Sequence, residues 1–270
     1  MNIQEIFDRI EYRTPGQARD DALSALKELR NPTPNLERLA LMPGWGLISK
    51  WLVSEDGEPT TLRILAEESG ASVADLAWVT NNAYDTPPSV CRSFWKKLID
   101  MGVGRTPTKI LFPSCGTGIF ALALKLDYPE IYDRCDITAI DIDPVRCQVF
   151  QHLNPKASVL CQDFLTWQRS MPDDQFHLVL DNVPFGSNRF DNEPIHVAFL
   201  RHMTRLAYKG GAIGYITSTG YTHSAGNMIA RQEQLQRSSL IHYFPLPQGV
   251  CRKMGTETGV DCYVFIKNRS

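Results

Sequence analysis

The chain has 270 residues, 43% of them hydrophobic, which is enough for one large domain with a full core and a smaller appendage. Its formal net charge is −2, no apolar run approaches the ~20 residues of a membrane span, and Met1–Glu5 lacks the features of a signal peptide. The seven cysteines form no CxxC pair and the six histidines no paired spacing, so we expect a cytoplasmic protein with reduced thiols, no metal site and no membrane contact.

Charge is distributed unevenly along the chain. Residues 1–90 hold 8 Lys and Arg against 14 Asp and Glu, whereas residues 186–257 hold 8 against 4. The basic excess of the second stretch suits a polyanionic partner. An ordinary solvated surface explains the same small excess about equally well.

The first 80 residues predict a mostly helical region. Residues 22–29 have the helical spacing of apolar side chains and stop before Asn31-Pro32-Thr33-Pro34. Pro43-Gly44-Trp45-Gly46 predicts a turn. We therefore expect a helical N-terminal region over residues 1–80 and a main domain over residues 81–270.

Residues 62–79 allow two interpretations. Their pattern of alanines, a glycine and later apolar residues is typical of a helix-turn-helix unit that reads DNA. Glu67, Glu68 and Asp75 would, however, place negative charge towards phosphates. A helical hairpin that packs on the main domain is therefore the favoured interpretation.

The main domain alternates between apolar strands and helices. After a helix over 90–101, strands are expected at 109–112, 136–140, 158–161, 176–182, 212–217, 240–246 and 261–267. Further helices are expected over 119–126, 144–152, 194–206 and 226–237. This order predicts an α/β fold with a doubly wound sheet, whose ligands bind beyond the carboxyl ends of the strands.

The stretch Asp181–Gly186 follows the fourth strand and predicts a stiff, exposed turn. Asn182 can donate and accept hydrogen bonds through its amide. Pro184 fixes its own φ and restricts Val183 to extended conformations, so backbone carbonyls can point outward. Phe185 offers a flat apolar face on which a planar group can stack. The stretch therefore predicts a site for a planar group that carries an NH₂.

The ends of the first three strands predict an adenosine site. The Gly116-Thr117-Gly118 loop lets the backbone approach a ligand, but it lacks the residues of a phosphate loop or a dinucleotide fingerprint. Asp141, with Asp143 beside it, is placed to accept from ribose hydroxyls, and Asp163 from an adenine amine. A helix cap is the alternative for each carboxylate. Together these residues describe an adenosine site without a phosphate cradle.

These motifs resemble the class I S-adenosylmethionine-dependent methyltransferases, specifically the enzymes that act on the N6 amine of adenine in DNA. The motifs that carry the resemblance are Tyr84-Asp85-Thr86-Pro87-Pro88, Pro113-Ser114-Cys115-Gly116-Thr117-Gly118, Ala139-Ile140-Asp141-Ile142-Asp143-Pro144, Gln162-Asp163-Phe164 and Asn182-Val183-Pro184-Phe185. Pro43–Gly46 and Gly255–Asp261 add a likeness to methyltransferase modules of plasmid and phage proteins that also carry a helicase. The resemblance covers roughly residues 40–270.

The resemblance implies a Rossmann-like sheet of seven mostly parallel strands with an antiparallel last strand, and S-adenosylmethionine as the cofactor. It implies that the amine is held by Asn182 and the carbonyl of Val183, and that Phe185 stacks on a base that is flipped out or single-stranded. It assigns cofactor binding to Tyr84, Thr86, Pro113, Ser114, Cys115, Gly116, Gly118, Asp141, Ile142, Asp163, Phe164 and Asn182, and catalysis to Asn182, Val183, Pro184 and Phe185. DNA is the expected substrate, and a helicase or specificity protein the expected partner.

The sequence also departs from the family pattern. Val183 replaces the first proline of the family's catalytic motif, and one extra residue separates Tyr84 from Thr86. We expect no obvious separate target-recognition domain after the core. Arg189, Phe190 and Tyr221, in the segments 186–194 and 218–226, are candidates for base or phosphate contacts or ordinary loop residues.

Three other functions remain open. The same turn can hold a glutamine amide of a protein or a base of RNA. A methyltransferase fold without activity could instead bind DNA or a partner protein.

Overall fold

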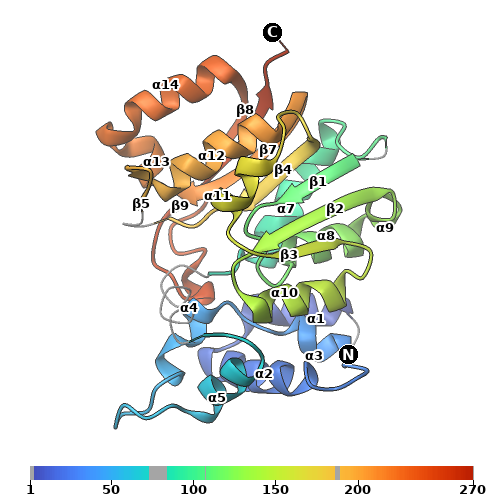
Figure 1. The fold of residues 1–270 in the computed structure, drawn as a ribbon, viewed down its shortest axis with the longest axis vertical. Helices are drawn as coiled ribbons and strands as arrows, with labels where there is room; N and C mark the ends of the chain where they lie inside the picture. The colour runs from blue at the N-terminus through green and yellow to red at the C-terminus, as the bar shows by residue number, and fades with distance from the viewer. Residues whose placement is uncertain (1–2, 73–83, 107, 186–188, 270) are drawn as a thin grey trace.

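The structure is a computed structural model that describes residues 3–72, 84–106, 108–185 and 189–269. It is built on a seven-stranded sheet with the order β3-β2-β1-β4-β7-β9-β8 (Figure 1). The strands are β1 (Thr108–Phe112), β2 (Cys135–Asp141), β3 (Ser158–Cys161), β4 (Phe176–Asn182), β7 (Ala207–Ser218), β8 (Ser238–Pro245) and β9 (Val260–Lys267). Within this sheet, β9 runs opposite to the other six strands, which confirms the predicted doubly wound sheet with an antiparallel last strand.

Each face of the sheet buries one of two apolar clusters. Ile110 and Phe112 of β1 point to the first cluster, and Leu111 between them points to the second. The first face is covered by α7 (Pro88–Asp100), α8 (Ile119–Asp127) and α10 (Pro144–Leu153), the second by α11 (Phe164–Trp167), α12 (Ile195–Leu206) and α14 (Met228–Arg237) (Figure 1). Successive apolar side chains of a strand point to opposite faces of the sheet, so each face needs its own layer of helices to cover it.

The N-terminal helices form a further layer beyond the first face (Figure 1). They are α1 (Ile3–Tyr12), α2 (Pro15–Glu28), α3 (Leu36–Ala40), α4 (Trp45–Ile48), the 3₁₀ turn η1 (Ser49–Trp51) and α5 (Thr61–Glu68). Thr14 and Gln17 form a capping box at the start of α2. Because α1 packs on α7 and α3 on α10, the first apolar cluster continues into this layer. The division of the chain near residue 80 stays a prediction.

Several local elements differ from those expected. β7 begins at Ala207 instead of residue 212, because Ala207 already pairs with Phe176 of β4. The segment after the predicted catalytic motif contains a hairpin of β5 (Arg189–Phe190) and β6 (Glu193–Pro194). The remaining short elements are α9 (Pro129–Tyr132), η2 (Gln168–Ser170), α13 (Gly220–His223), η3 (Ala225–Asn227) and η4 (Arg252–Met254).

The predicted helix-turn-helix segment is only partly described. Its first half is α5, which packs on α2, whereas residues 73–79 lie outside the described residues. No helix within the described part of the chain has the length and apolar character to cross a membrane. Across the same residues, no cluster of three or more His, Cys, Asp or Glu side chains could hold a metal ion.

Candidate cofactor and substrate site

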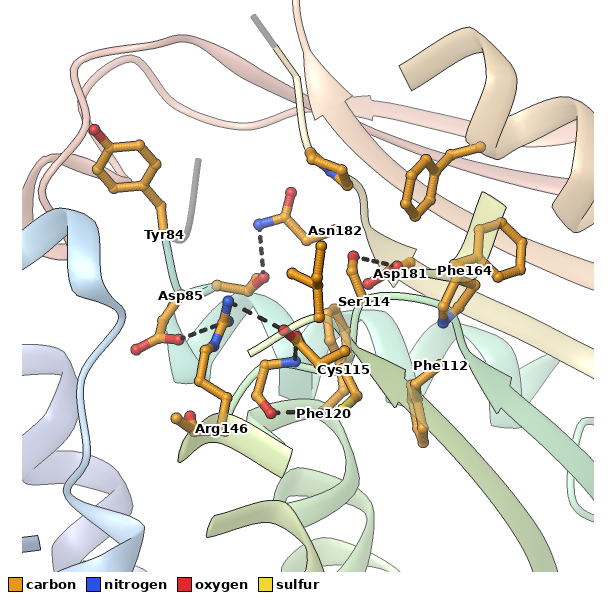
Figure 2. Close-up of a pocket in the computed structure, with 18 of the residues that line it drawn as sticks. Tyr84, Asp85, Phe112, Ser114, Cys115, Phe120, Arg146, Phe164, Asp181 and Asn182 are labelled. Carbon is orange, nitrogen blue, oxygen red and sulfur yellow. Dashed lines mark hydrogen bonds and ion pairs between the residues drawn. The ribbon is translucent and has the colours of Figure 1, made fainter. Parts of the chain in front are cut away.

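A pocket opens at the carboxyl ends of β1, β2 and β4 (Figure 2). The space inside the pocket, together with the solvent at its open mouth, is about 910 Å³. Most of the predicted site residues line it: Tyr84, Thr86, Pro113, Ser114, Cys115, Gly116, Asp141, Ile142, Asp163, Phe164, Asn182 and Pro184. Segments far apart in the sequence thus meet at one edge of the sheet, as the strand order predicts.

The loop after β1 depends on two glycines in the left-handed region. Gly116 has φ +58° and Gly118 has φ +93°. A Cβ on Gly116 would overlap the guanidinium of Arg146, and one on Gly118 would lie 2.8 Å from the Phe150 ring. Gly118 does not line the pocket, so its place in the structure is that of a close-packed turn before α8.

Asp141 connects the loops after β1 and β2. Its carboxylate accepts hydrogen bonds from the backbone N–H of Gly116 at 2.8 Å and of Asp143 at 3.0 Å. Each carboxylate oxygen can accept a second bond, so Asp141 retains the capacity to bind hydroxyl groups in the pocket.

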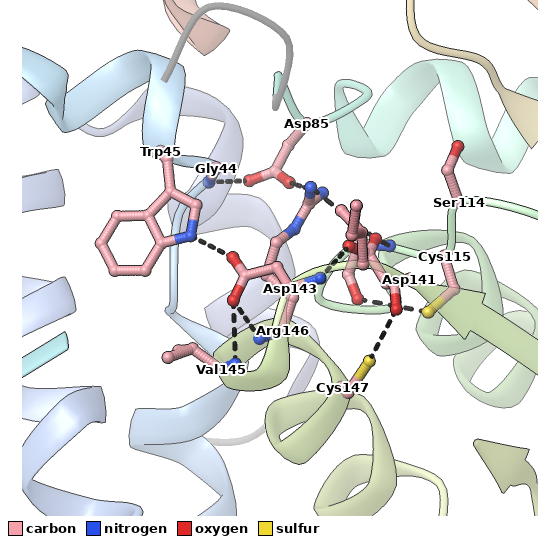
Figure 3. Close-up of polar contacts among 12 residues, drawn as sticks. Gly44, Trp45, Asp85, Ser114, Cys115, Asp141, Asp143, Val145, Arg146 and Cys147 are labelled. Atoms are coloured by element: carbon pink, nitrogen blue, oxygen red, sulfur yellow. Dashed lines mark hydrogen bonds and ion pairs between the residues drawn. The ribbon is translucent and has the colours of Figure 1, made fainter. Parts of the chain in front are cut away.

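A buried arginine lies beneath the same loops (Figure 3). The Arg146 guanidinium lies 3.8 Å from both the Asp141 and the Asp85 carboxylates. Burial alone lowers the pKa of Arg146, but the neighbouring carboxylates of Asp141, Asp85 and Asp143 outweigh it and raise that pKa. Arg146 is therefore a permanent positive charge that neutralises part of an acidic pocket wall.

The Pro43–Gly46 segment supports this wall from outside (Figure 3). The backbone N–H of Gly44 donates to Asp85 at 2.5 Å, and the indole N–H of Trp45 donates to Asp143. Asp143 also caps α10 by accepting from Val145 N at 2.9 Å. Its carboxylate does not line the pocket, so the expectation that it joins Asp141 there is wrong. Burial, with the Asp141 charge nearby, raises the pKa of Asp143 to about 6.

Trp45→Phe tests this support. The phenyl ring retains apolar packing, but the Asp143 carboxylate loses a donor in a buried site. We expect a loss of about 1–3 kcal/mol in the free energy of unfolding, measured by urea denaturation. A variant as stable as the wild type would show that this bond contributes nothing to the fold.

Asp163 and Phe164 form the far wall of the pocket. The Asp163 carboxylate accepts from the N–H groups of Leu165 and Thr166, so it caps α11, which is the alternative that its position allowed. Phe164 is buried, and its ring lies 4.9 Å from that of Phe199. A contact from Asp163 to an adenine amine stays a prediction.

Asn182 ends β4 at the mouth of the pocket (Figure 2). Its Nδ2 donates to the Thr86 hydroxyl at 3.0 Å, which fixes the orientation of the amide. Its Oδ1 is buried and accepts no hydrogen bond from any described residue. A buried carbonyl oxygen without a donor is unfavourable, so this atom is available to a ligand N–H.

The other residues of the predicted catalytic motif differ in whether they reach the pocket. Pro184 lines the pocket, whereas Val183 is buried in the second cluster and donates its N–H to Ile216 O at 3.1 Å. Phe185 is half-buried against the first cluster and does not line the pocket. The stacking of Phe185 on a base stays a prediction.

The segments beyond the motif hold the three candidate surface residues. The Arg169 guanidinium lies over the Phe190 ring at 5.3 Å, and the Arg189 side chain donates to the Asn192 carbonyl. Tyr221 is only 2% exposed and packs on Tyr215, so it is not a free surface contact for a base.

Three charged pocket residues were not singled out from the sequence. They are Asp85, Arg146 and Asp181. Asp85 lies within the Tyr84–Pro88 motif and Asp181 directly precedes Asn182. Their positions beside predicted site residues could have indicated that both line the pocket. Nothing in the sequence around Arg146 indicated a role in the pocket, because that role depends on ion pairs with Asp85 and Asp141.

No established family profile matches the chain, but two viral proteins are similar in sequence. The "Defense against restriction protein B" of Escherichia phage P1 is 27% identical over 196 residues, which are 68% of this chain and 8% of that protein. The type II methyltransferase M.CvrRI of Paramecium bursaria Chlorella virus XZ-6E is 33% identical over 79 residues, which are 29% of this chain and 19% of that protein. The matched stretches thus span less than a fifth of either relative.

Solved structures share the architecture at low sequence identity. A Listeria monocytogenes protein assigned as a class I S-adenosylmethionine-dependent methyltransferase has a TM-score of 0.60 and 14% identity, and the match covers 98% of this chain and 88% of that one. A protein assigned as the modification subunit of a Vibrio vulnificus type I restriction enzyme has a TM-score of 0.58 and 19% identity, with 87% and 50% covered. A protein assigned as an RNA methyltransferase of Pyrococcus horikoshii has a TM-score of 0.52 and 17% identity, with 70% and 88% covered. These likenesses and the strand order confirm the predicted fold: the chain has the fold of the class I S-adenosylmethionine-dependent methyltransferases.

Proposed function

We propose that this chain is a methyltransferase that moves the methyl group of S-adenosylmethionine to the N6 amine of adenine in DNA. The observation that carries the proposal is the buried, unpaired Oδ1 of Asn182 in a pocket lined by most of the residues predicted to bind the cofactor. The fold supports S-adenosylmethionine as the cofactor, and the unpaired acceptor oxygen at the end of β4 supports an amine as the group that is methylated.

The residues present fit the cofactor. Asp141 has acceptor capacity for ribose hydroxyls, and Ile142 and Phe164 offer apolar surface to a base. The excess of carboxylates over cations in the lining suits a ligand with a positive centre, as a sulfonium is. When bound, S-adenosylmethionine supplies an electrophilic methyl group.

Asn182 then prepares the acceptor. The lone pair of an adenine amine is delocalised into the ring, so the amine is a poor nucleophile. An N–H donated to Asn182 Oδ1 draws the nitrogen towards tetrahedral geometry, while Thr86 holds the amide in place. Attack then depends mostly on positioning, and the methylated amine loses its extra proton readily to water.

The choice of DNA rests on the two relatives and one structural neighbour. One relative is described as a defence against restriction, the other as a type II methyltransferase, and the neighbour as a restriction modification subunit. A base in a duplex must flip out to reach the pocket, so a single-stranded region is an equally suitable substrate. Because the matches span small parts of longer relatives, a helicase or specificity protein as partner is also part of the proposal.

Transfer of a tritiated methyl group tests the proposal. Duplex DNA, single-stranded DNA, RNA and protein are incubated in parallel with the chain and labelled S-adenosylmethionine. We expect label in DNA, removed by nuclease. Label in RNA or protein would favour the RNA or glutamine alternatives, and label in none would contradict the proposed activity for the chain by itself.

A further inference from the structure

The pocket lining holds four carboxylates and one guanidinium. They belong to Asp85, Asp141, Asp163, Asp181 and Arg146. Arg146 lies within 3.8 Å of Asp85 and Asp141, and Asp163 is used as a helix cap. Among the described residues, no ion pair includes Asp181. Among the described residues that line the pocket, Asp181 is thus a buried carboxylate without an ion-pair partner.

Asp181 lies directly before Asn182 at the end of β4 and is 3% exposed. Its carboxylate accepts a hydrogen bond from the Ser114 hydroxyl at 2.5 Å (Figure 2). Burial raises the pKa of Asp181 to about 7, although bonds from Ser114 oppose the change. The charged or titratable groups around it are Asp141, Arg146 and the Cys115 thiol, while β7 contributes the buried Tyr215 and α12 lines the pocket with Ile195 and Phe199.

An unpaired buried carboxylate can be neutralised in two ways. It takes up a proton, or a cation binds beside it. The methyl donor carries a positive charge on sulfur, whereas its product, S-adenosylhomocysteine, has a neutral thioether. The two molecules otherwise share the same adenosine, amino and carboxyl groups, so they differ by one methyl group and one charge.

We propose that Asp181 is the residue by which the pocket distinguishes the charged methyl donor from its neutral product. The proposal rests on the proposed cofactor. With the donor bound, Asp181 is ionised and balances the sulfonium charge. After methyl transfer that charge is gone, and Asp181 takes up one proton from solvent and keeps its hydrogen bond with Ser114 as a neutral acid.

The expected pH dependence follows from these two states. Asp181 of the free protein ionises near pH 7, and a nearby cation lowers its pKa. The donor therefore binds more tightly as pH rises through this range, while the product gains no such advantage. Titration of protein groups that affect both ligands equally cancels in the ratio of their dissociation constants, and Asp181→Asn accounts for the difference between the ligands' own amino groups.

Calorimetry with both ligands and the full chain measures this ratio. We expect the preference for S-adenosylmethionine over S-adenosylhomocysteine to rise about tenfold between about pH 6 and about pH 8.5. Buffers of different ionisation enthalpy count the protons exchanged. Near pH 7 the donor should release part of one proton, and the product should release none or take up part of one.

Three variants identify the responsible group. Asp181→Asn should remove both the pH dependence of the ratio and the proton release. Ser114→Ala removes the donor that stabilises the ionised form, so the midpoint of the pH dependence should move to higher pH. Asp143→Asn is the matched control, because Asp143 is also buried with a raised pKa but lies outside the pocket lining. It should leave the ratio and its pH dependence unchanged.

The outcomes separate this inference from the proposed function. If both ligands bind with a pH-independent ratio, the inference is wrong while the cofactor assignment stands. If neither ligand binds at any pH, both are wrong. If Asp181→Asn does not fold, an unmoved midpoint in Ser114→Ala overturns the inference, and a raised midpoint supports it.

Discussion

Asn182→Ala should reduce methyl transfer by about 10²–10³-fold while the affinity for S-adenosylmethionine changes far less. The variant removes the buried Oδ1 that is proposed to accept from the adenine amine, and it leaves the β1 and β2 loops intact. Single-turnover rates at saturating cofactor measure the chemical step, and calorimetry measures cofactor binding.

Thr86→Val is the matched control for this prediction. It preserves the shape of the side chain but removes the hydroxyl that accepts from Asn182 Nδ2 at 3.0 Å. We expect a loss of about tenfold in the single-turnover rate, smaller than in Asn182→Ala, because the amide is present but no longer fixed. Full turnover in Asn182→Ala would exclude Asn182 as the residue that binds the amine.

Arg146→Met should produce the largest loss of stability. The substitution leaves the buried carboxylates of Asp85 and Asp141 without their cation. Breaking a buried pair in this way lowers the free energy of unfolding by about 3–5 kcal/mol, which urea denaturation at pH 7 measures. Burial already raises the pKa of Asp85, so the variant should lose less stability as pH falls and Asp85 takes up a proton.

A double variant is the control for the Arg146 prediction. Asp85→Asn combined with Arg146→Met removes one of the two charges that the single variant leaves unpaired. The double variant should therefore be more stable than the sum of the two single losses predicts. Strict additivity would show that Asp85 and Arg146 do not interact in the folded protein.

The sheet was predictable because its signals are local. Each strand is a short apolar run, and the motif at its end marks the carboxyl edge, so the pocket could be located from the sequence. The order of the strands in the sheet could be predicted only through the resemblance to known methyltransferases. The early start of β7 could not be seen, because it depends on the pairing of Ala207 with Phe176.

The hydrogen bonds and ion pairs around the pocket were less predictable from the sequence. Trp45 and Asp143 are separated by 98 positions, and nothing in either neighbourhood indicates that the indole donates to that carboxylate. Asp163 illustrates a different limit, because a carboxylate at a strand end serves equally well as a helix cap or a ligand. In the structure Asp163 both caps α11 and lines the pocket, so the cap does not exclude a contact with a ligand.

The most direct test of the proposed function is the chemical identity of the methylated product. DNA incubated with the chain and S-adenosylmethionine is digested to nucleosides and analysed by mass spectrometry, with Asn182→Ala as the control. The account predicts N6-methyladenine in DNA treated with the wild-type chain and almost none with the variant. A methyl group on cytosine, or N6-methyladenine formed equally by both proteins, would contradict it.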